Sequence, residues 1–294
     1  MRSPETISAT RVVKCVVSLG VFLFTRAAEM VSRLSGKPPN GKCVILYYHS
    51  VPANQRQQFS RQMDTLLRHT KPLSLLNAPP LRPGVHHVAV TFDDALRNLL
   101  KNAIPELERR NIPATIFAIS GALGKTFGAP RCMEQVMTPE ELQALPEDLI
   151  TIGSHSVTHP FFPAITREAA RWELRQSRAD LTHVLHKDIR LFSFPFGGCS
   201  KELVELCREA GYQRVFTTQP HLAFTVPHQF ALGRIRVDPT DWPFEFFLKI
   251  SGAYRWLPWA FRLKRRFRSS GFLRTLLLKR NSIPKVTVPK AVIQ

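Results

Sequence analysis

Short apolar runs alternate with segments of helical periodicity through the middle of the chain. Buried strands are predicted by the runs at residues 43–48, 88–92, 114–119, 149–153, 191–194, 215–218 and 231–237. Helices are predicted between them, at residues 59–69 and 95–111, from Thr138, from Thr166, and from Ser200 to Gly211. In the helix after Thr166, we expect Trp172, Leu174 and Leu181 on the buried face. This repeated strand–helix alternation is typical of a parallel α/β sheet or barrel.

Charge divides the chain into three parts. The net charge of the 294 residues is +19, which by itself suggests a nucleic-acid or anionic-membrane partner. Residues 1–42 carry +5 and residues 246–294 carry +12, whereas residues 43–245 carry only +2. We therefore expect a nearly neutral α/β domain at 43–245 between two basic appendages. A nucleic-acid binder with a basic globular surface is disfavoured.

Both appendages combine cations with apolar residues. An apolar run at residues 15–24 follows Arg11 and Lys14, and at ten residues it is shorter than the roughly 20 that span a bilayer. A helix over residues 12–34 fits the breakers that follow it; a membrane-surface or signal-anchor helix, a buried helix and a cleaved signal peptide all remain open. The aromatic and basic tail suits an anionic bilayer, but also a helix packed on the domain. The side of the membrane is open as well.

Polar motifs directly follow three of the predicted strands. They are Thr91-Phe92-Asp93-Asp94, Ser154-His155-Ser156-Val157-Thr158-His159 and Phe194-Pro195-Phe196-Gly197-Gly198. Each alone has an ordinary explanation: a helix cap, a pair of loop histidines and a tight turn. Strand ends of one α/β array converge, however, so one aspartate and two histidines would form a metal site with open positions, leaving the other aspartate to act as a base. The combination indicates metal-assisted hydrolysis.

These motifs, with the later Arg208-Glu209-Ala210-Gly211-Tyr212, resemble the polysaccharide deacetylase family, also called the NodB-homology domain or carbohydrate esterase family 4, over about residues 47–237. The resemblance implies a distorted (β/α) barrel of about seven strands and a hydrolase that removes N-acetyl groups from an amino-sugar polysaccharide or oligosaccharide. It implies a divalent metal, Zn²⁺ before others, on Asp94, His155 and His159. It also implies Asp93 as the general base, with the turn of Pro195, Phe196 and Gly197 supplying the Phe196 N–H to the oxyanion.

Two positions depart from the family pattern. Ala95 stands where a glycine usually follows the aspartate pair, and no arginine precedes the proline turn. A subgroup with Tyr-His on the first strand and Arg-Ile on the last is similar to this chain. That likeness implies that Arg234 or Arg236, expected on one strand face, holds Asp93 ionised, and we favour Arg234. It also implies His49 as the acid that protonates the leaving amine.

Two alternatives stand beside a deacetylase of soluble glycans. The basic, aromatic tails suggest a deacylase or deformylase that acts on a lipid-linked amino sugar at a membrane. The two departures from the pattern suggest an inactive barrel used as a carbohydrate-binding or membrane scaffold. An N-acetylated glycan is the expected partner, an anionic membrane surface a second one, and nucleic acid is not expected.

Overall fold

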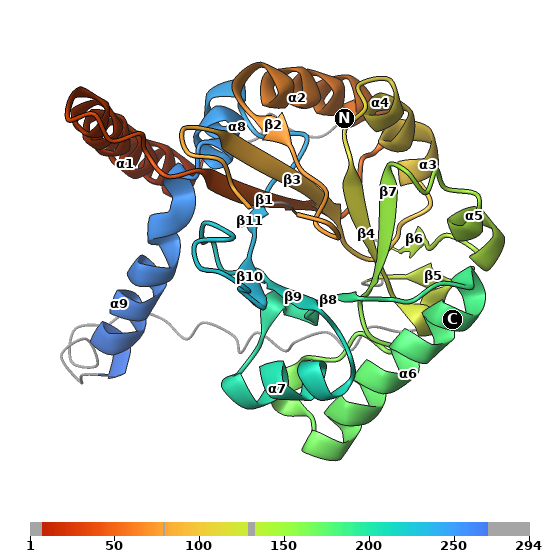
Figure 1. Cartoon of the computed structure of the whole chain (residues 1–294). Coiled ribbons are helices and arrows are strands. Elements are labelled where there is room, and N and C mark those ends of the chain that lie inside the picture. The colour runs from red at the N-terminus through yellow and green to blue at the C-terminus, as the bar shows by residue number, and fades with distance from the viewer. Residues whose placement is uncertain (1–7, 79, 129–132, 270–294) are drawn as a thin grey trace.

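Parallel strands form a barrel at the centre of the molecule, and helices surround it (Figure 1). The computed structural model describes residues 8–78, 80–128 and 133–269, the last six of these by their backbone alone. Around the barrel the strands follow the order β10-β9-β8-β7-β4-β3-β1-β11, and β2 (Lys71–Pro72) pairs with β3 outside this path. The predicted (β/α) barrel is confirmed.

The strand path closes through one interrupted strand. Its members are β1 (Lys42–Tyr48), β3 (His86–Phe92), β4 (Ala114–Ala118), β7 (Ile150–Ser154), β8 (Leu191–Ser193), β9 (Arg214–Thr217), β10 (Ala231–Gly233) and β11 (Ile235–Arg236). Only Arg234 separates β10, which pairs with β9, from β11, which pairs with β1. The eight segments therefore occupy seven positions around the barrel. The strand expected at residues 231–237 is split because it changes partner at Arg234.

The helices and smaller elements lie mainly on the outside. The helices are α1 (Ala9–Leu34), α2 (Arg56–His69), α3 (Leu99–Asn102), α4 (Ile104–Glu108), α5 (Pro139–Gln143), α6 (Arg167–Leu185), α7 (Lys201–Glu209), α8 (Pro243–Ile250) and α9 (Leu257–Ser269). Outside the barrel, β5 (Thr126–Phe127) pairs antiparallel with β6 (Glu134–Gln135). Side-chain caps at Thr138, Thr166 and Ser200 start α5, α6 and α7, as their sequences predict.

Two expectations about helices were wrong. The segment 95–111 is not one helix: Asp94 and Ala95 have positive φ, and Pro105, which has no N–H to donate, lies at the start of α4. On α6, Trp172 is 52% exposed, whereas its neighbour Glu173 is buried. The apolar periodicity located the helix correctly but misassigned the edge of its buried face.

Alternate residues of β1 enter two different cores. On β1, Val44 and Leu46 join the large cluster between strands and helices, whereas Cys43 and Ile45 join a smaller cluster. The smaller cluster also contains strand residues Ala89, Phe117, Leu191, Phe216 and Leu232, which come from β3, β4, β8, β9 and β10. Residues that follow the carboxyl end of a strand in the same alternation therefore extend its interior face.

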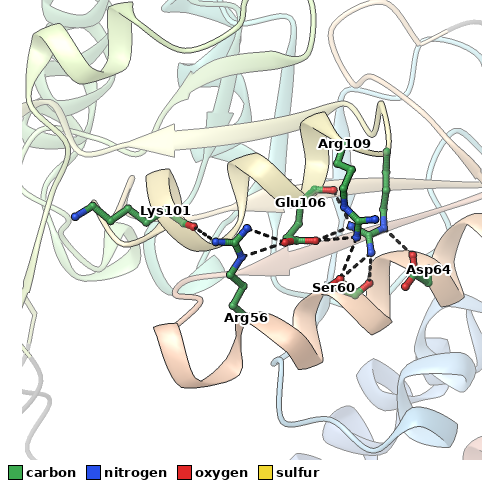
Figure 2. Close-up of polar contacts among 7 residues, drawn as sticks. Arg56, Ser60, Asp64, Lys101, Glu106 and Arg109 are labelled. Atoms are coloured by element: carbon green, nitrogen blue, oxygen red, sulfur yellow. Dashed lines mark hydrogen bonds and ion pairs between the residues drawn. The ribbon is translucent and has the colours of Figure 1, made fainter.

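A buried carboxylate ties α2 to α4, away from the strand ends that carry the motifs. Glu106 accepts hydrogen bonds from Arg56, Arg109 and Arg110 at 2.8–3.1 Å (Figure 2). Arg110 also pairs with Asp64 of α2 at 2.7 Å. Burial alone would raise the pKa of Glu106, but these arginines outweigh it and lower the pKa to about 2. The network serves stability.

The two appendages lie on one side of the barrel, where α1 (dark red) and α9 (blue) project in Figure 1. Helix α8 runs across the expected boundary at residue 245, because its apolar residues Phe246, Leu248 and Ile250 are buried against the rest of the chain. Packing therefore joins the first part of the basic segment to the barrel. The predicted tail beyond residue 269, including Phe272, Leu273 and Arg274, lies outside the described residues.

Candidate metal and hydrolytic site

The predicted site residues meet at the carboxyl ends of the strands. Asp93 and Asp94 follow β3, His155 follows β7, and the proline turn follows β8. His49 follows β1, and Arg234 lies between β10 and β11. Parallel strands bring these six positions to one rim of the barrel, as is usual for functional residues in such folds.

Asp94, His155 and His159 form a compact set of ligand atoms. Their candidate ligand atoms lie within 4.8 Å of one another. The Asp94 Oδ1 atom is 3.6 Å from His155 Nε2 and 3.5 Å from His159 Nε2. Ligands bound to one tetrahedral Zn²⁺ at about 2.0–2.1 Å lie roughly 3.4 Å apart, so these spacings fit a shared cation.

The protonation states in this set also fit a cation. Asp94 Oδ1 is buried and has no hydrogen-bond partner within the described structure. Burial and the neighbouring Asp93 charge raise the pKa of Asp94 to about 8, because no protein group compensates its charge fully. Burial lowers the pKa of His155 to about 4 and that of His159 to about 3. Both imidazoles are therefore neutral at pH 7, the form that binds metals.

Contacts outside this set hold the two histidines in place. His155 Nδ1 lies 2.7 Å from the Ser193 carbonyl oxygen, which assigns the proton to Nδ1 and leaves the Nε2 lone pair directed at Asp94. Glu173 of α6 accepts hydrogen bonds from the backbone N–H groups of Val157 and Thr158, at 2.7 and 3.0 Å, and from the Thr158 hydroxyl. Glu173 thus fixes the loop between the histidines, which we call the histidine loop (residues 155–159).

Arg234 holds Asp93 with two parallel hydrogen bonds. Its Nη1 and Nη2 atoms donate to Asp93 Oδ1 and Oδ2 at 2.7 and 2.8 Å, and the arginine is fully buried. Burial by itself would raise the pKa of Asp93, but the guanidinium outweighs it and holds the pKa well below its usual range. Arg236, expected on the same face, is exposed and makes no hydrogen bond to Asp93.

The buried guanidinium is satisfied on several sides. It donates to Thr91 Oγ1 at 3.0 Å and to Ser193 Oγ at 2.7 Å. It also lies over the rings of Tyr47 and Phe117, at 4.7 and 5.3 Å from their centroids. Charge burial of this kind is tolerated only when nearly every donor has a partner. Asp93 is therefore held as an anion in a fixed orientation.

The proline turn presents one candidate amide donor. Pro195 has no N–H, and the Gly197 N–H already donates to the Phe194 carbonyl at 2.9 Å, which leaves the N–H of Phe196. Gly197 has φ of +70°, and a Cβ there would overlap the side chain of Thr218. The Phe196 ring is 56% exposed and lies 4.7 Å from the His159 ring, so the turn borders the metal-ligand set.

His49 lies at the rim near Asp93. Its side chain is accessible to solvent, and its ring is 5.7 Å from that of Tyr47. Partial desolvation by the surrounding rim lowers the pKa of His49, while the Asp93 charge opposes this shift. The His49 imidazole therefore loses its proton at a lower pH than an ordinary histidine does.

Backbone strain is concentrated at this rim. Of the nine non-glycine residues with positive φ in the described structure, five border the site: Asp94, Ala95, Ser156, His159 and Phe196. Ala95, where the family usually has glycine, adopts φ of 51°. Such conformations cost about 1–3 kcal/mol each and persist where surrounding contacts enforce them.

Sequence reasoning missed three supporting residues. Glu173 supports the histidine loop, and Thr91 and Ser193 support Arg234. Thr91 and Ser193 sit in apolar strands two residues before Asp93 and Pro195, so a polar residue on the interior face was the available signal. Glu173 gave none, because it reads as a solvent-facing helix residue.

The chain is similar to proteins of one known family. Residues 82–215 match the family model described as polysaccharide deacetylase. The Bacillus subtilis (strain 168) protein YxkH, named as a polysaccharide deacetylase on a provisional basis, is 27% identical over 209 residues, which cover 67% of this chain and 72% of that protein.

Solved structures share the fold. IcaB from Ammonifex degensii has a TM-score of 0.61 at 23% identity, covering 74% of this chain and 98% of IcaB. A polysaccharide deacetylase from Bacillus cereus has a TM-score of 0.60 at 22% identity, covering 72% of this chain and 69% of the other. The family match and the barrel together show that the chain is similar to the polysaccharide deacetylase family, whose members are hydrolases of carbon–nitrogen bonds.

Proposed function

We propose that this protein is a metal-dependent hydrolase that removes N-acetyl groups from an amino-sugar polysaccharide or oligosaccharide. The observation that carries the proposal is that two adjacent carboxylates have different electrostatic surroundings. Asp94 is directed at two neutral histidines and has no protein cation of its own, whereas Asp93 is held ionised by Arg234. One carboxylate is thus suited to bind a metal and the other to accept a proton.

Asp94, His155 and His159 would hold the ion, and Zn²⁺ is the ion we propose, because one carboxylate and two imidazoles with open positions suit it. A bound divalent ion supplies Lewis acidity for hydrolysis. His155 donates a hydrogen bond to the Ser193 carbonyl, and Glu173 accepts hydrogen bonds from the histidine loop. These contacts keep both Nε2 atoms directed at one point.

Three further residues have proposed roles in the reaction. Asp93 accepts the proton of the attacking water, and the arginine beside it keeps its carboxylate charged and oriented. The Phe196 N–H donates to the oxyanion that develops from the amide carbonyl. His49 protonates the nitrogen as the C–N bond breaks. Water adds to the acetyl carbon, and the products are acetate and a free amino sugar.

Acetate release from a panel of N-acetylated chitooligosaccharides tests the proposal. After treatment with a chelator, we expect activity to disappear and to return with Zn²⁺ or Co²⁺. Hydrolysis that survives complete removal of metal would contradict metal dependence. Glycan binding by a protein that holds no metal and releases no acetate would instead support the inactive scaffold.

A second candidate is a deacylase or deformylase that acts on a lipid-linked amino sugar, with the protein associated with a membrane. The observation that favours it is α1, which by length and composition would suffice to cross a membrane and of which little is buried. Turnover of a polyprenyl-linked amino sugar in vesicles, compared with that of a soluble chitooligosaccharide, separates the two. Faster turnover of the soluble substrate would exclude the second candidate.

A further inference from the structure

The inner face of α1 carries polar and apolar residues and docks on the barrel, with Phe22 packed against Phe247 of α8. Arg11 pairs with Glu245 of α8 at 2.7 Å, and Ser18 accepts a hydrogen bond from Trp256 at 2.9 Å. Further along, Thr25 accepts from Arg255 at 2.7 Å. With Cys15, which contacts Tyr254, and Phe22, the contact residues recur every three or four positions, so they share one face of the helix.

The opposite face of α1 is apolar and uncovered. Its large side chains are 57–78% exposed and lie at Val13, Val16, Leu23, Phe24, Val31 and Leu34. The residues between them on this face are small or apolar, and every charged residue of α1 lies on the docked face or beside it. Surface helices normally show the reverse arrangement, with the polar face in water. A continuous apolar strip of this length indicates a surface that something covers.

A basic cleft adjoins the second half of α1. It measures about 420 Å³, and Arg33 of α1, Arg68 and Lys71 line it. Its only carboxylate, Glu29, is already paired with Lys42 at 2.7 Å and Arg26 at 3.2 Å. In the described part of the chain, no carboxylate pairs with Arg33, Arg68 or Lys71, so the cleft has an excess of positive charge beside the apolar strip.

We propose that α1 lies in the plane of an anionic lipid bilayer, with its apolar face among the acyl chains and the basic cleft at the phosphate headgroups. This inference rests on the proposed membrane association and deepens it by assigning the surface and the orientation. Apolar residues flanked by cations are the pattern of helices that lie in a membrane interface.

The docked contacts exclude a spanning orientation. The 26 residues of α1 extend about 39 Å, which is enough to cross about 30 Å of hydrocarbon, so length does not decide. Spanning in the docked position, however, would draw Glu245 and Lys249 of α8 into hydrocarbon, where charged groups are strongly disfavoured. Spanning after undocking would break the Arg11–Glu245 pair and expose the polar residues of the docked face to lipid. Lying in the plane keeps both faces satisfied.

Charge also disfavours a second copy of the chain as the cover. Two chains of net charge +19 that met through α1 would bring two basic clefts together. An anionic surface removes that repulsion.

Co-sedimentation of the full chain with vesicles tests the inference, using phosphatidylcholine vesicles with and without about one third phosphatidylglycerol. We expect the pair Val16→Asp and Phe24→Asp to lower binding to anionic vesicles at least tenfold. We expect Arg33→Gln and Lys71→Gln to lower it about fivefold each. Trp172→Asp is the control: Trp172 is also an exposed apolar residue, on α6 at the opposite side of the barrel, and binding should stay within twofold (Figure 1). Equal losses in the control, or none in the α1 variants, would overturn the inference.

Depth measurements test the orientation. Val13→Trp, Phe24→Trp and Leu34→Trp are compared with the unsubstituted protein for quenching by lipids brominated at shallow or deep positions. In-plane insertion predicts the same shallow depth for all three, whereas the deepest signal at Phe24→Trp alone would show a spanning helix and overturn the inference. A dimer in lipid-free solution that Phe24→Asp dissociates would also overturn it, because a second copy then covers the strip.

Hydrolysis of a soluble chitooligosaccharide is measured on the same samples. Full turnover without vesicle binding overturns the membrane inference and leaves the deacetylase proposal intact. Vesicle binding as expected, without turnover under any metal, overturns the deacetylase proposal and supports the membrane inference.

Discussion

Replacing Arg234 with methionine removes the cation that keeps Asp93 charged. The guanidinium is fully buried and donates to both Asp93 oxygens, at 2.7 and 2.8 Å, as well as to Thr91 and Ser193. Removing one partner of a buried ion pair costs about 3–5 kcal/mol, because the other charge is left uncompensated. Asp93 can avoid part of that cost by binding a proton, but it then cannot accept one from water.

We therefore expect Arg234→Met to lower kcat for acetate release about 10²–10⁴-fold. The loss should be greater at pH 6 than at pH 9: without Arg234, burial and the Asp94 charge raise the pKa of Asp93, so only higher pH restores its anion. Arg236→Met, two residues further along and exposed, is the matched control and should change the free energy of unfolding by less than about 0.5 kcal/mol. An unchanged pH profile in a folded Arg234→Met protein, or equal losses in the control, would refute the reasoning.

Three other changes test separate parts of the structure. Glu173→Ala frees the histidine loop and should weaken Zn²⁺ binding about 10–100-fold by titration calorimetry, whereas Glu168→Ala, exposed on the same helix, should leave it unchanged. Glu106→Ala should lower the free energy of urea unfolding at pH 7 by about 2–3 kcal/mol, against almost no change for Glu108→Ala. Because its folded pKa is lowered to about 2, the contribution of Glu106 is complete above about pH 4.5 and is lost as the pH falls towards 2, so the two variants should converge in acid. His49→Ala should lower kcat about 10²–10³-fold with little change in KM; steady-state rates equal to those of the unchanged protein would remove His49 from the mechanism.

The order of elements was predictable because it follows from local patterns. Apolar runs marked the barrel strands, and the capping residues Thr138, Thr166 and Ser200 marked three helix starts. The same reasoning placed the aspartate and histidine motifs at one rim, because parallel strands share a carboxyl edge.

What remained unpredictable depends on contacts between distant segments. The interruption at Arg234 arises because the last strand pairs with β9 on one side and β1 on the other, which no local pattern specifies. The positive φ of Ala95 is enforced by surrounding packing, although alanine itself does not favour it. The role of Glu173 requires knowing which loop lies opposite α6, and the charge count that suggested a boundary at residue 245 did not detect the buried face of α8.

The central claim is that Asp94 holds a metal while Asp93 moves a proton. The most direct measurement is metal content and acetate release, side by side, for Asp93→Asn and Asp94→Asn, each purified after equilibration with Zn²⁺. The account predicts that Asp93→Asn retains about one equivalent of metal but releases no acetate, and that Asp94→Asn loses both. Full acetate release by Asp94→Asn without metal, or by Asp93→Asn at the rate of the unchanged protein, would contradict it.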